Sequence, residues 1–327
     1  MYERMKLETE RDGVEWVYAA KALAIVSAWS ALGLFDKLRN GPVPRAELPG
    51  DRRALDATIP VLVHVGVLSA DEERVALTPN AARLLATGAL PTSKSLELLT
   101  DLGKMAEVIS QGGPVRDAEG RPKATRGGTV PDPAKTEAFL DYLYRISGEA
   151  AESTLGWLAP DLPERASILD LGGGHGRYAR AFADAGHHVT LFDQPLVVSL
   201  ARKRHGDVLA YMEGDFHQVE SFGGPYDLVL LCNIVHSESP DANASLIARA
   251  AKCLRSGGRL VIRDMFLDEH GAHPASAAFF GITMLFYTEH GSSPTVKEAR
   301  EWCERAGLCD VSLAVFETHQ MLIARRP

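Results

Sequence analysis

The cluster of glycines at residues 172–176 constrains this fold more than any other feature of the sequence. An apolar run at 168–171 breaks abruptly into three glycines, and a fourth follows after one histidine. Because glycine lacks a Cβ, the chain can turn sharply here and its backbone can approach a ligand closely. Residues 177–185 then carry apolar side chains at helical spacing before Gly186. The pattern predicts a strand and a helix joined by a glycine turn, with the helix N-terminus facing a ligand.

A second apolar run, 189–192, ends at Asp193. Together these elements make a nucleotide-binding βαβ unit, in which the second acid accepts both ribose hydroxyls. The glycine spacing alone leaves the ligand open, because Gly174, Gly176 and Ala179 also fit the dinucleotide pattern, and a turn without ligand is a further alternative. Asp170, near the end of the first strand, favours another ligand. A carboxylate sits poorly beside a pyrophosphate but neutralises a cationic amino-acid group.

This segment resembles the first motif of the class I S-adenosylmethionine-dependent methyltransferases, an acid followed by G-x-G-x-G. The resemblance implies S-adenosylmethionine as cofactor and an α/β fold with a Rossmann-like methyltransferase sheet. Apolar stretches at 311–316 and 320–324, around a turn at Glu317 and Thr318, predict the C-terminal antiparallel hairpin of that sheet, where a dinucleotide fold would continue with a crossover helix. The resemblance implies cofactor-binding roles for Asp170, Gly172, Gly174, Gly176, Asp193, Gln194, Gly214, Asp215, Phe216, Cys232 and Asn233.

The N-terminal part of the chain predicts a mainly α winged-helix pattern. Residues 17–38 read as a helix that is apolar around most of its circumference, which is typical of a subunit interface. A turn at 41–49, a helix at 55–65 and a hairpin with strands near 66–68 and 75–77 follow. A DNA-binding regulator is one interpretation, but the helix offers few basic residues and the net charge is -8. We therefore expect no nucleic-acid partner.

The same part of the chain resembles the N-terminal dimerisation domain of small-molecule O-methyltransferases related to plant caffeate and hydroxyindole enzymes. The resemblance rests on Ala-Leu-Gly-Leu-Phe-Asp at 31–36, Gly-Val-Leu at 66–68 and Leu-Thr-Pro at 77–79. It implies a homodimer in which one protomer helps to line the other's pocket. The predicted domains are a dimerisation domain at 1–110, a lid loop and connecting helix at 111–157, and a catalytic domain at 158–327.

Two segments are candidates for binding an acceptor molecule. Residues 112–133 are rich in glycine, proline and charge, and we interpret them as a mobile lid whose basic residues include Arg126. Helical spacing resumes over 136–157, and residues 274–287 are apolar and aromatic, which suits a flat apolar molecule, although core packing is the alternative for both. The candidate acceptor-binding residues are Phe139, Tyr142, Leu143, Phe279, Phe280 and Met284.

The candidate base lies beyond the apolar strand predicted at 227–231. Ligands of parallel sheets bind outside the carboxyl ends of the strands, which is where His236 lies. Residues 231–236 resemble the family segment ending in His-Asp-Trp, and the resemblance implies that His236 deprotonates a hydroxyl. Ser237 replaces the family's aspartate, so Glu238 or another carboxylate, with Glu289 as a second candidate, is expected to orient the imidazole.

The expected function is methylation of a hydroxyl on an aromatic or polyketide-like small molecule in secondary metabolism. N- or C-methylation, or another reaction on the same cofactor-binding fold, remains open because of the change at Ser237. The four cysteines form no C-x-x-C pair, so we expect neither a metal site nor disulfides. A charged start without an apolar core, and no long apolar run, predict a cytoplasmic protein without a membrane partner.

Overall fold

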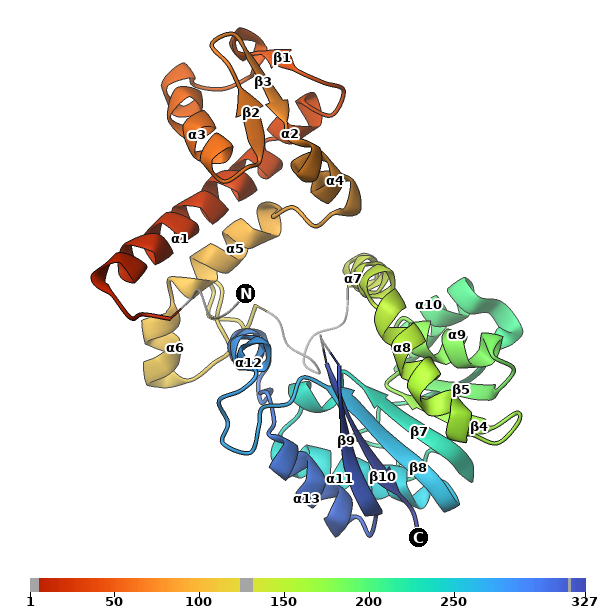
Figure 1. Ribbon diagram of the computed structural model, residues 1–327. Helices are drawn as coiled ribbons and strands as arrows, with labels where there is room; N and C mark the ends of the chain where they lie inside the picture. The colour runs from red at the N-terminus through yellow and green to blue at the C-terminus, as the bar shows by residue number, and fades with distance from the viewer. Residues whose placement is uncertain (1–5, 124–131, 317–318) are drawn as a thin grey trace. The chain divides into compact units, whose positions relative to one another are not determined.

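The computed structural model describes residues 6–123, 132–316 and 319–327 (Figure 1). Within these residues the chain forms two compact units, one ending at Gln111 and the other beginning at Gly112. The segment predicted to connect two domains therefore belongs with the second unit. The central part of the proposed lid, with Arg126, and the turn at Glu317 and Thr318 lie outside the described residues.

The second unit is built on one mixed sheet of seven strands among the described residues, in the order β6-β5-β4-β7-β8-β10-β9. The strands from β6 to β8 pair in parallel, and β10 then pairs antiparallel with β8 and with β9. The predicted methyltransferase-type sheet with its closing hairpin is thereby confirmed. The strands are β4 (Ser167–Leu171), β5 (His188–Asp193), β6 (Ala210–Glu213), β7 (Tyr226–Cys232), β8 (Leu254–Asp264), β9 (Cys309–Val315) and β10 (Gln320–Arg325).

Helices cover both faces of this sheet, which makes three layers (Figure 1). Every residue of β7 is buried, as expected for the centre of a parallel sheet. One face packs against α8 (Gly148–Leu158), α9 (Arg177–Asp184) and α10 (Pro195–His205). The other face packs against α11 (Pro240–Lys252) and α13 (Val296–Arg305).

The strand order creates a switch point between β4 and β7. From β4 the chain continues through β5 to β6 on one side of the sheet, and it then returns to β7 and β8 on the other. The connections at the carboxyl ends of β4 and β7 therefore diverge and leave a crevice, which is where ligands bind in open α/β sheets. The glycine loop and the segment that contains His236 both begin at this edge.

Some predicted element boundaries differ from the structure. The helix predicted at 136–157 is two helices, α7 (Pro133–Ile146) and α8, because the chain bends at Ser147. The strand β8 begins at Leu254, and its pairing with β7 shifts register between Leu254 and Arg259. The aromatic segment forms α12 (Ala275–Tyr287).

The first unit combines six helices with a three-stranded antiparallel sheet in the described residues. The helix predicted at 17–38 is divided by Gly33, whose positive φ ends α1 before α2 begins. The turn predicted at 41–49 includes a short strand that pairs with β3 and completes the sheet. The elements are α1 (Glu10–Ala31), α2 (Leu34–Lys37), β1 (Val43–Pro44), α3 (Arg52–His64), β2 (Leu68–Ala70), β3 (Arg74–Leu77), α4 (Pro79–Thr87), α5 (Ser93–Leu102) and α6 (Met105–Gln111). None of the helices in the described part of the chain is long and apolar enough to cross a membrane.

Candidate active site

The glycine loop makes the sharp turn that the sequence predicts, and its backbone is left-handed at three of the glycines. Gly172, Gly174 and Gly176 have φ values of 73°, 53° and 70°, which side chains rarely tolerate. A Cβ at Gly172 would lie 2.5 Å from Ile234 Cδ1, and one at Gly176 would lie 2.7 Å from His205 Nε2. At Gly174 the nearest atom is 3.8 Å away, so this glycine leaves its backbone open. The loop is thus tightly packed at Gly172 and Gly176, whereas the backbone at Gly174, between them, has room for a ligand to approach.

Asp170 lies beneath this loop and is fully buried. Its Oδ2 accepts a hydrogen bond from the backbone N–H of Ala179 at 3.2 Å, which fixes the start of α9. Its Oδ1 is buried without a hydrogen-bond partner among the described residues. Burial raises the pKa of this carboxyl to about 7; the hydrogen bond from Ala179 opposes the shift and the nearby Asp193 charge adds to it. A cation bound above the loop would favour the ionised form of Asp170.

Asp193 connects the glycine loop to the end of β5. Its Oδ2 accepts a hydrogen bond from the N–H of Gly174 at 2.8 Å, and its Oδ1 accepts one from the N–H of Gln194 at 2.7 Å. In nucleotide-binding βαβ units, an acid at the end of the second strand is the usual acceptor for the ribose hydroxyls. The Gln194 side chain is exposed at the start of α10.

The loop after β6 continues the same edge of the sheet. The N–H of Gly214 donates to the carbonyl of Asp193 at 3.0 Å, which holds the two strand ends together. Asp215 accepts hydrogen bonds within its own loop, from His217 N–H at 2.9 Å and Gln218 Nε2 at 3.1 Å. Phe216 is partly buried beside them. The structure thus brings the predicted cofactor residues of β4, β5 and β6 to one edge.

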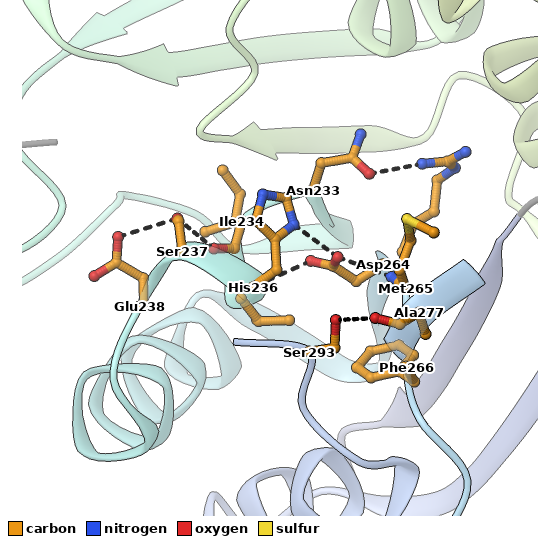
Figure 2. A network of polar contacts seen from close by, with 12 residues as sticks. Asn233, Ile234, His236, Ser237, Glu238, Asp264, Met265, Phe266, Ala277 and Ser293 are labelled. Carbon is orange, nitrogen blue, oxygen red and sulfur yellow. Dashed lines mark hydrogen bonds and ion pairs between the residues drawn. The ribbon is translucent and has the colours of Figure 1, made fainter. Parts of the chain in front are cut away.

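His236 lies in a short 3₁₀ turn, η5 (Val235–Ser237), just beyond β7. Its ring Nδ1 is 2.7 Å from Oδ1 of Asp264, and the second Asp264 oxygen accepts the His236 backbone N–H at 3.4 Å (Figure 2). Burial by itself raises the pKa of Asp264, but the His236 ring and the hydrogen bonds outweigh burial and hold it below its usual value. The ionised Asp264 fixes Nδ1–H as the donor, so Nε2 is the acceptor nitrogen of the ring.

The carboxylate that contacts the imidazole is thus neither Glu238 nor Glu289 but Asp264, which agrees with the wider expectation of another carboxylate. Figure 2 shows the Glu238 carboxylate turned away from the ring. Its two oxygens lie 3.3 Å from His217 Nε2 and 3.4 Å from Ser237 Oγ. Glu289 is exposed in the loop after α12, and that loop contacts the His236 backbone through the N–H of Ser292. The signal for Asp264 was its place at the end of β8, because parallel strands end at the same edge.

Cys232 and Asn233 close β7 opposite the glycine loop. Cys232 is buried, and burial raises the pKa of its thiol well above the usual value. Asn233 has a positive φ of 57°, and its Oδ1 accepts a hydrogen bond from Arg263 Nη1 at 2.9 Å. Arg263 pairs in register with Cys232 and was not assigned from the sequence. Its guanidinium carbon lies 5.3 Å from the ring centroid of Tyr178, at the start of α9.

His175, inside the glycine loop, attaches that loop to α7 and α8. Its Nδ1 accepts the N–H of Arg177 at 3.0 Å, so its Nε2, 3.3 Å from Ser147 Oγ, carries the proton. Burial first, then the neighbouring Arg204 charge, lowers the pKa of His175 to about 4. The ring is therefore neutral at pH 7 and has a structural contact that the sequence did not indicate.

The candidate acceptor residues lie on two helices. Phe280 on α12 meets the His236 ring edge to face, with centroids 4.9 Å apart, and Met284 is buried on the same helix. Phe279 is exposed. On α7, Phe139 and Tyr142 are exposed and Leu143 is partly buried. The structure thus places one predicted acceptor residue, Phe280, in contact with the candidate base.

These residues fit the amino-acid nucleoside that the sequence indicates. Asp193 ends β5, where the acid of a βαβ unit accepts ribose hydroxyls, and the open backbone at Gly174 allows close approach. A buried carboxyl with a free acceptor position, Asp170, lies beneath the loop.

Comparisons with known proteins agree with this geometry. The family model described as O-methyltransferase domain matches residues 96–309. The tetracenomycin polyketide synthesis 8-O-methyl transferase of Streptomyces glaucescens is 27% identical over 330 residues, covering 93% of each chain. The L-tyrosine C(3)-methyltransferase of Streptomyces lavendulae is 26% identical over 305 residues, covering 84% of this chain and 80% of the relative. The crystal structure of human N-acetylserotonin methyltransferase in complex with SAM superposes with a TM-score of 0.76 and 19% identity, covering 98% of both chains.

The buried Asp170 predicts an unusual dependence of stability on pH. Its pKa is raised in the folded state, so between pH 4 and 7 the folded protein keeps a proton that the unfolded chain has lost, and stability falls as pH rises. The variant Asp170→Asn has no carboxyl at this position, so its stability should not fall for this reason as pH rises. Relative to the wild type, its unfolding free energy should rise by about 2–3 kcal/mol between pH 5 and pH 8. Urea denaturation at both pH values measures this, with the exposed Asp207→Asn as control. If the unfolding free energies of Asp170→Asn and the wild type differ by the same amount at both pH values, burial does not raise the pKa of Asp170.

Proposed function

The chain belongs to the O-methyltransferase domain family, and from that premise we propose that it transfers a methyl group from S-adenosylmethionine to a hydroxyl of an aromatic or polyketide-like small molecule in secondary metabolism. The observation that supports the acceptor chemistry best is the His236–Asp264 pair at the carboxyl edge of the sheet. Its ring is held at the same edge as the glycine loop and Asp193. The Streptomyces glaucescens relative, which matches 93% of this chain, carries the name of a polyketide 8-O-methyl transferase, which is consistent with this acceptor class.

The reaction is an in-line displacement that needs a base. When bound, S-adenosylmethionine supplies an electrophilic methyl carbon with a good leaving group. The acceptor oxygen must lie about 3 Å from that carbon, and a phenol, with a pKa near 10, must give up its proton. His236 Nε2 takes this proton as the new carbon–oxygen bond forms and the carbon–sulfur bond breaks. Asp264 holds the ring in the required tautomer and stabilises the imidazolium that results.

The surroundings of His236 favour a flat, apolar acceptor. The His236 side chain is largely buried, and Phe280 covers it edge to face. Aromatic rings prefer such contacts, and an aromatic acceptor extends them. Water is also kept from the imidazole, which strengthens its interaction with Asp264.

C-methylation is a second candidate, since a relative that matches 84% of this chain is a tyrosine C(3)-methyltransferase. Deprotonation of a phenol by His236 also activates the ring carbon beside the oxygen. NMR of the product separates the two outcomes, because only O-methylation gives a methoxy signal.

We also propose that the protein is a cytoplasmic homodimer formed through its first unit. The N-terminal half of α1 exposes Val14, Trp16, Val17 and Tyr18. Such a concentration of apolar side chains is typical of an interface. Light scattering of the double variant Trp16→Glu, Val17→Glu should then give the monomer mass. The control Lys37→Glu, which changes an exposed side chain of α2, should remain dimeric, and a wild type of monomer mass would reject the proposal.

Replacement of the base should separate chemistry from cofactor binding. The variant His236→Ala is expected to lower kcat by about 10²–10⁴-fold, the usual contribution of a general base. Its affinity for S-adenosylhomocysteine, measured by calorimetry, should stay within about twofold, because His236 contacts the acceptor side. The exposed His270→Ala serves as control. Full activity in His236→Ala would remove the base assignment.

Replacement of the orienting acid should also impair turnover. In Asp264→Asn the uncharged amide no longer fixes the imidazole tautomer, and we expect kcat to fall by about 10²–10⁴-fold. The double variant with His236→Ala should be barely slower than either single variant, because the two residues act as one unit. Glu238→Gln is the matched control and should lose less. Additive losses in the double variant would show that Asp264 acts independently of the histidine.

A further inference from the structure

Arg263 is a buried cation that lacks an anionic partner among the described residues. It is 6% exposed, and its Nη1 donates to Asn233 Oδ1, a neutral acceptor. Its Nε is buried without a hydrogen-bond partner in the described part of the chain. The next residue, Asp264, is bonded to His236 instead. Because buried charges are costly unless paired, this guanidinium indicates a missing anion.

The position of Arg263 defines where that anion lies. The residue is the last but one of β8, in register with Cys232 of β7, and its guanidinium lies near Tyr178 in the first turn of α9. Asn233, which holds the guanidinium, lies directly beyond β7. The charge is therefore at the crevice between the end of β7 and the helix that follows the glycine loop, at the switch point of the sheet.

The proposed cofactor, S-adenosylmethionine, has an anionic α-carboxylate that could lie beside Arg263. Across the carboxyl edge, Asp193 on β5 is placed for the ribose and Phe216 beyond β6 for the base, both on one side of β4. The amino-acid part then extends to the other side of the glycine loop, toward β7 and β8. We propose that Arg263 binds the α-carboxylate of S-adenosylmethionine, and that Asn233 holds the guanidinium in position. This inference rests on the proposed function and names the subsite of one functional group.

Two other arginines near the loop already have partners. Arg204 pairs with Asp141 and lies over the ring of Tyr144 at 4.4 Å from its centroid. The guanidinium carbon of Arg177 lies 4.8 Å from the centroid of the same ring, and its Nη2 is 4.0 Å from Glu152 Oε1. Arg263 differs from both because it is buried and forms no ion pair with a carboxylate in the part of the chain that the structure describes.

The test compares two ligands that differ by the carboxylate alone. Calorimetry measures the affinity of the wild type for S-adenosylmethionine and for decarboxylated S-adenosylmethionine. We expect a preference of at least about tenfold for the carboxylate form, as a desolvated charge-assisted pair confers. In Arg263→Gln this preference should fall to within about twofold. Arg177→Gln, the matched control, should keep the wild-type preference.

Thermal unfolding distinguishes a binding role from a structural one. Free Arg263→Gln should unfold at or above the wild-type Tm, because an unpaired buried charge has been removed, while S-adenosylhomocysteine should raise its Tm less than that of the wild type. Arg263→Lys keeps the charge without the planar fork and should retain part of the preference. If Arg263→Gln does not fold, the comparison of Arg263→Lys with the wild type gives the answer.

Three results would overturn the inference. A wild type that binds both ligands equally would contradict the carboxylate subsite but leave the proposed function intact. An unchanged preference in Arg263→Gln, or in Arg263→Lys where the former does not fold, or a selective loss in Arg177→Gln, would assign the subsite elsewhere. A wild type that binds neither ligand would contradict the proposed function itself, and this inference with it.

Discussion

The parallel pairing of β7 with β4 and β8 is the constraint on which the functional edge depends. It brings the ends of three strands together, so that Asp170, Asn233 and Asp264 come from distant parts of the sequence to one edge. Each of these strands is mostly buried on both faces, so a shift of register would move the polar residues at its end away from the shared edge and place them among apolar side chains, which is costly. The apolar sequence of the strands therefore fixes the positions of the polar residues at their ends.

That edge carries charge that the free protein compensates only in part. Asp264 is hydrogen-bonded to the His236 ring, whereas Asp170 and Arg263 each have a buried polar atom without a partner in the described residues. Such groups lower stability when unpaired, and they become favourable when a ligand of matching charge arrives. An amino acid carries one ammonium and one carboxylate. The zwitterionic end of such a ligand could therefore pair its ammonium with Asp170 and its carboxylate with Arg263. The cost to stability and the affinity for the ligand thus have a common origin.

The sequence predicted the sheet, its closing hairpin and the glycine loop well, because each depends on local pattern. The glycines are needed where the backbone has a positive φ, and Asp193 can be located because it ends the apolar run of its strand. The position of Asp264 depends instead on which strands are neighbours and where β8 ends, and that information is not local. Glu238 was the nearer acid in sequence, but its side chain reaches His217 instead. Arg263 was missed for a similar reason, since a single arginine in an apolar strand gives no motif.

A crystal structure with S-adenosylhomocysteine bound would show directly how the ligand lies on this edge. We expect the ribose on Asp193, the amino-acid end toward β7 and β8, and the sulfur facing the space beside His236 Nε2. A ligand with its ribose away from Asp193, or with its sulfur directed away from His236, would contradict this expectation.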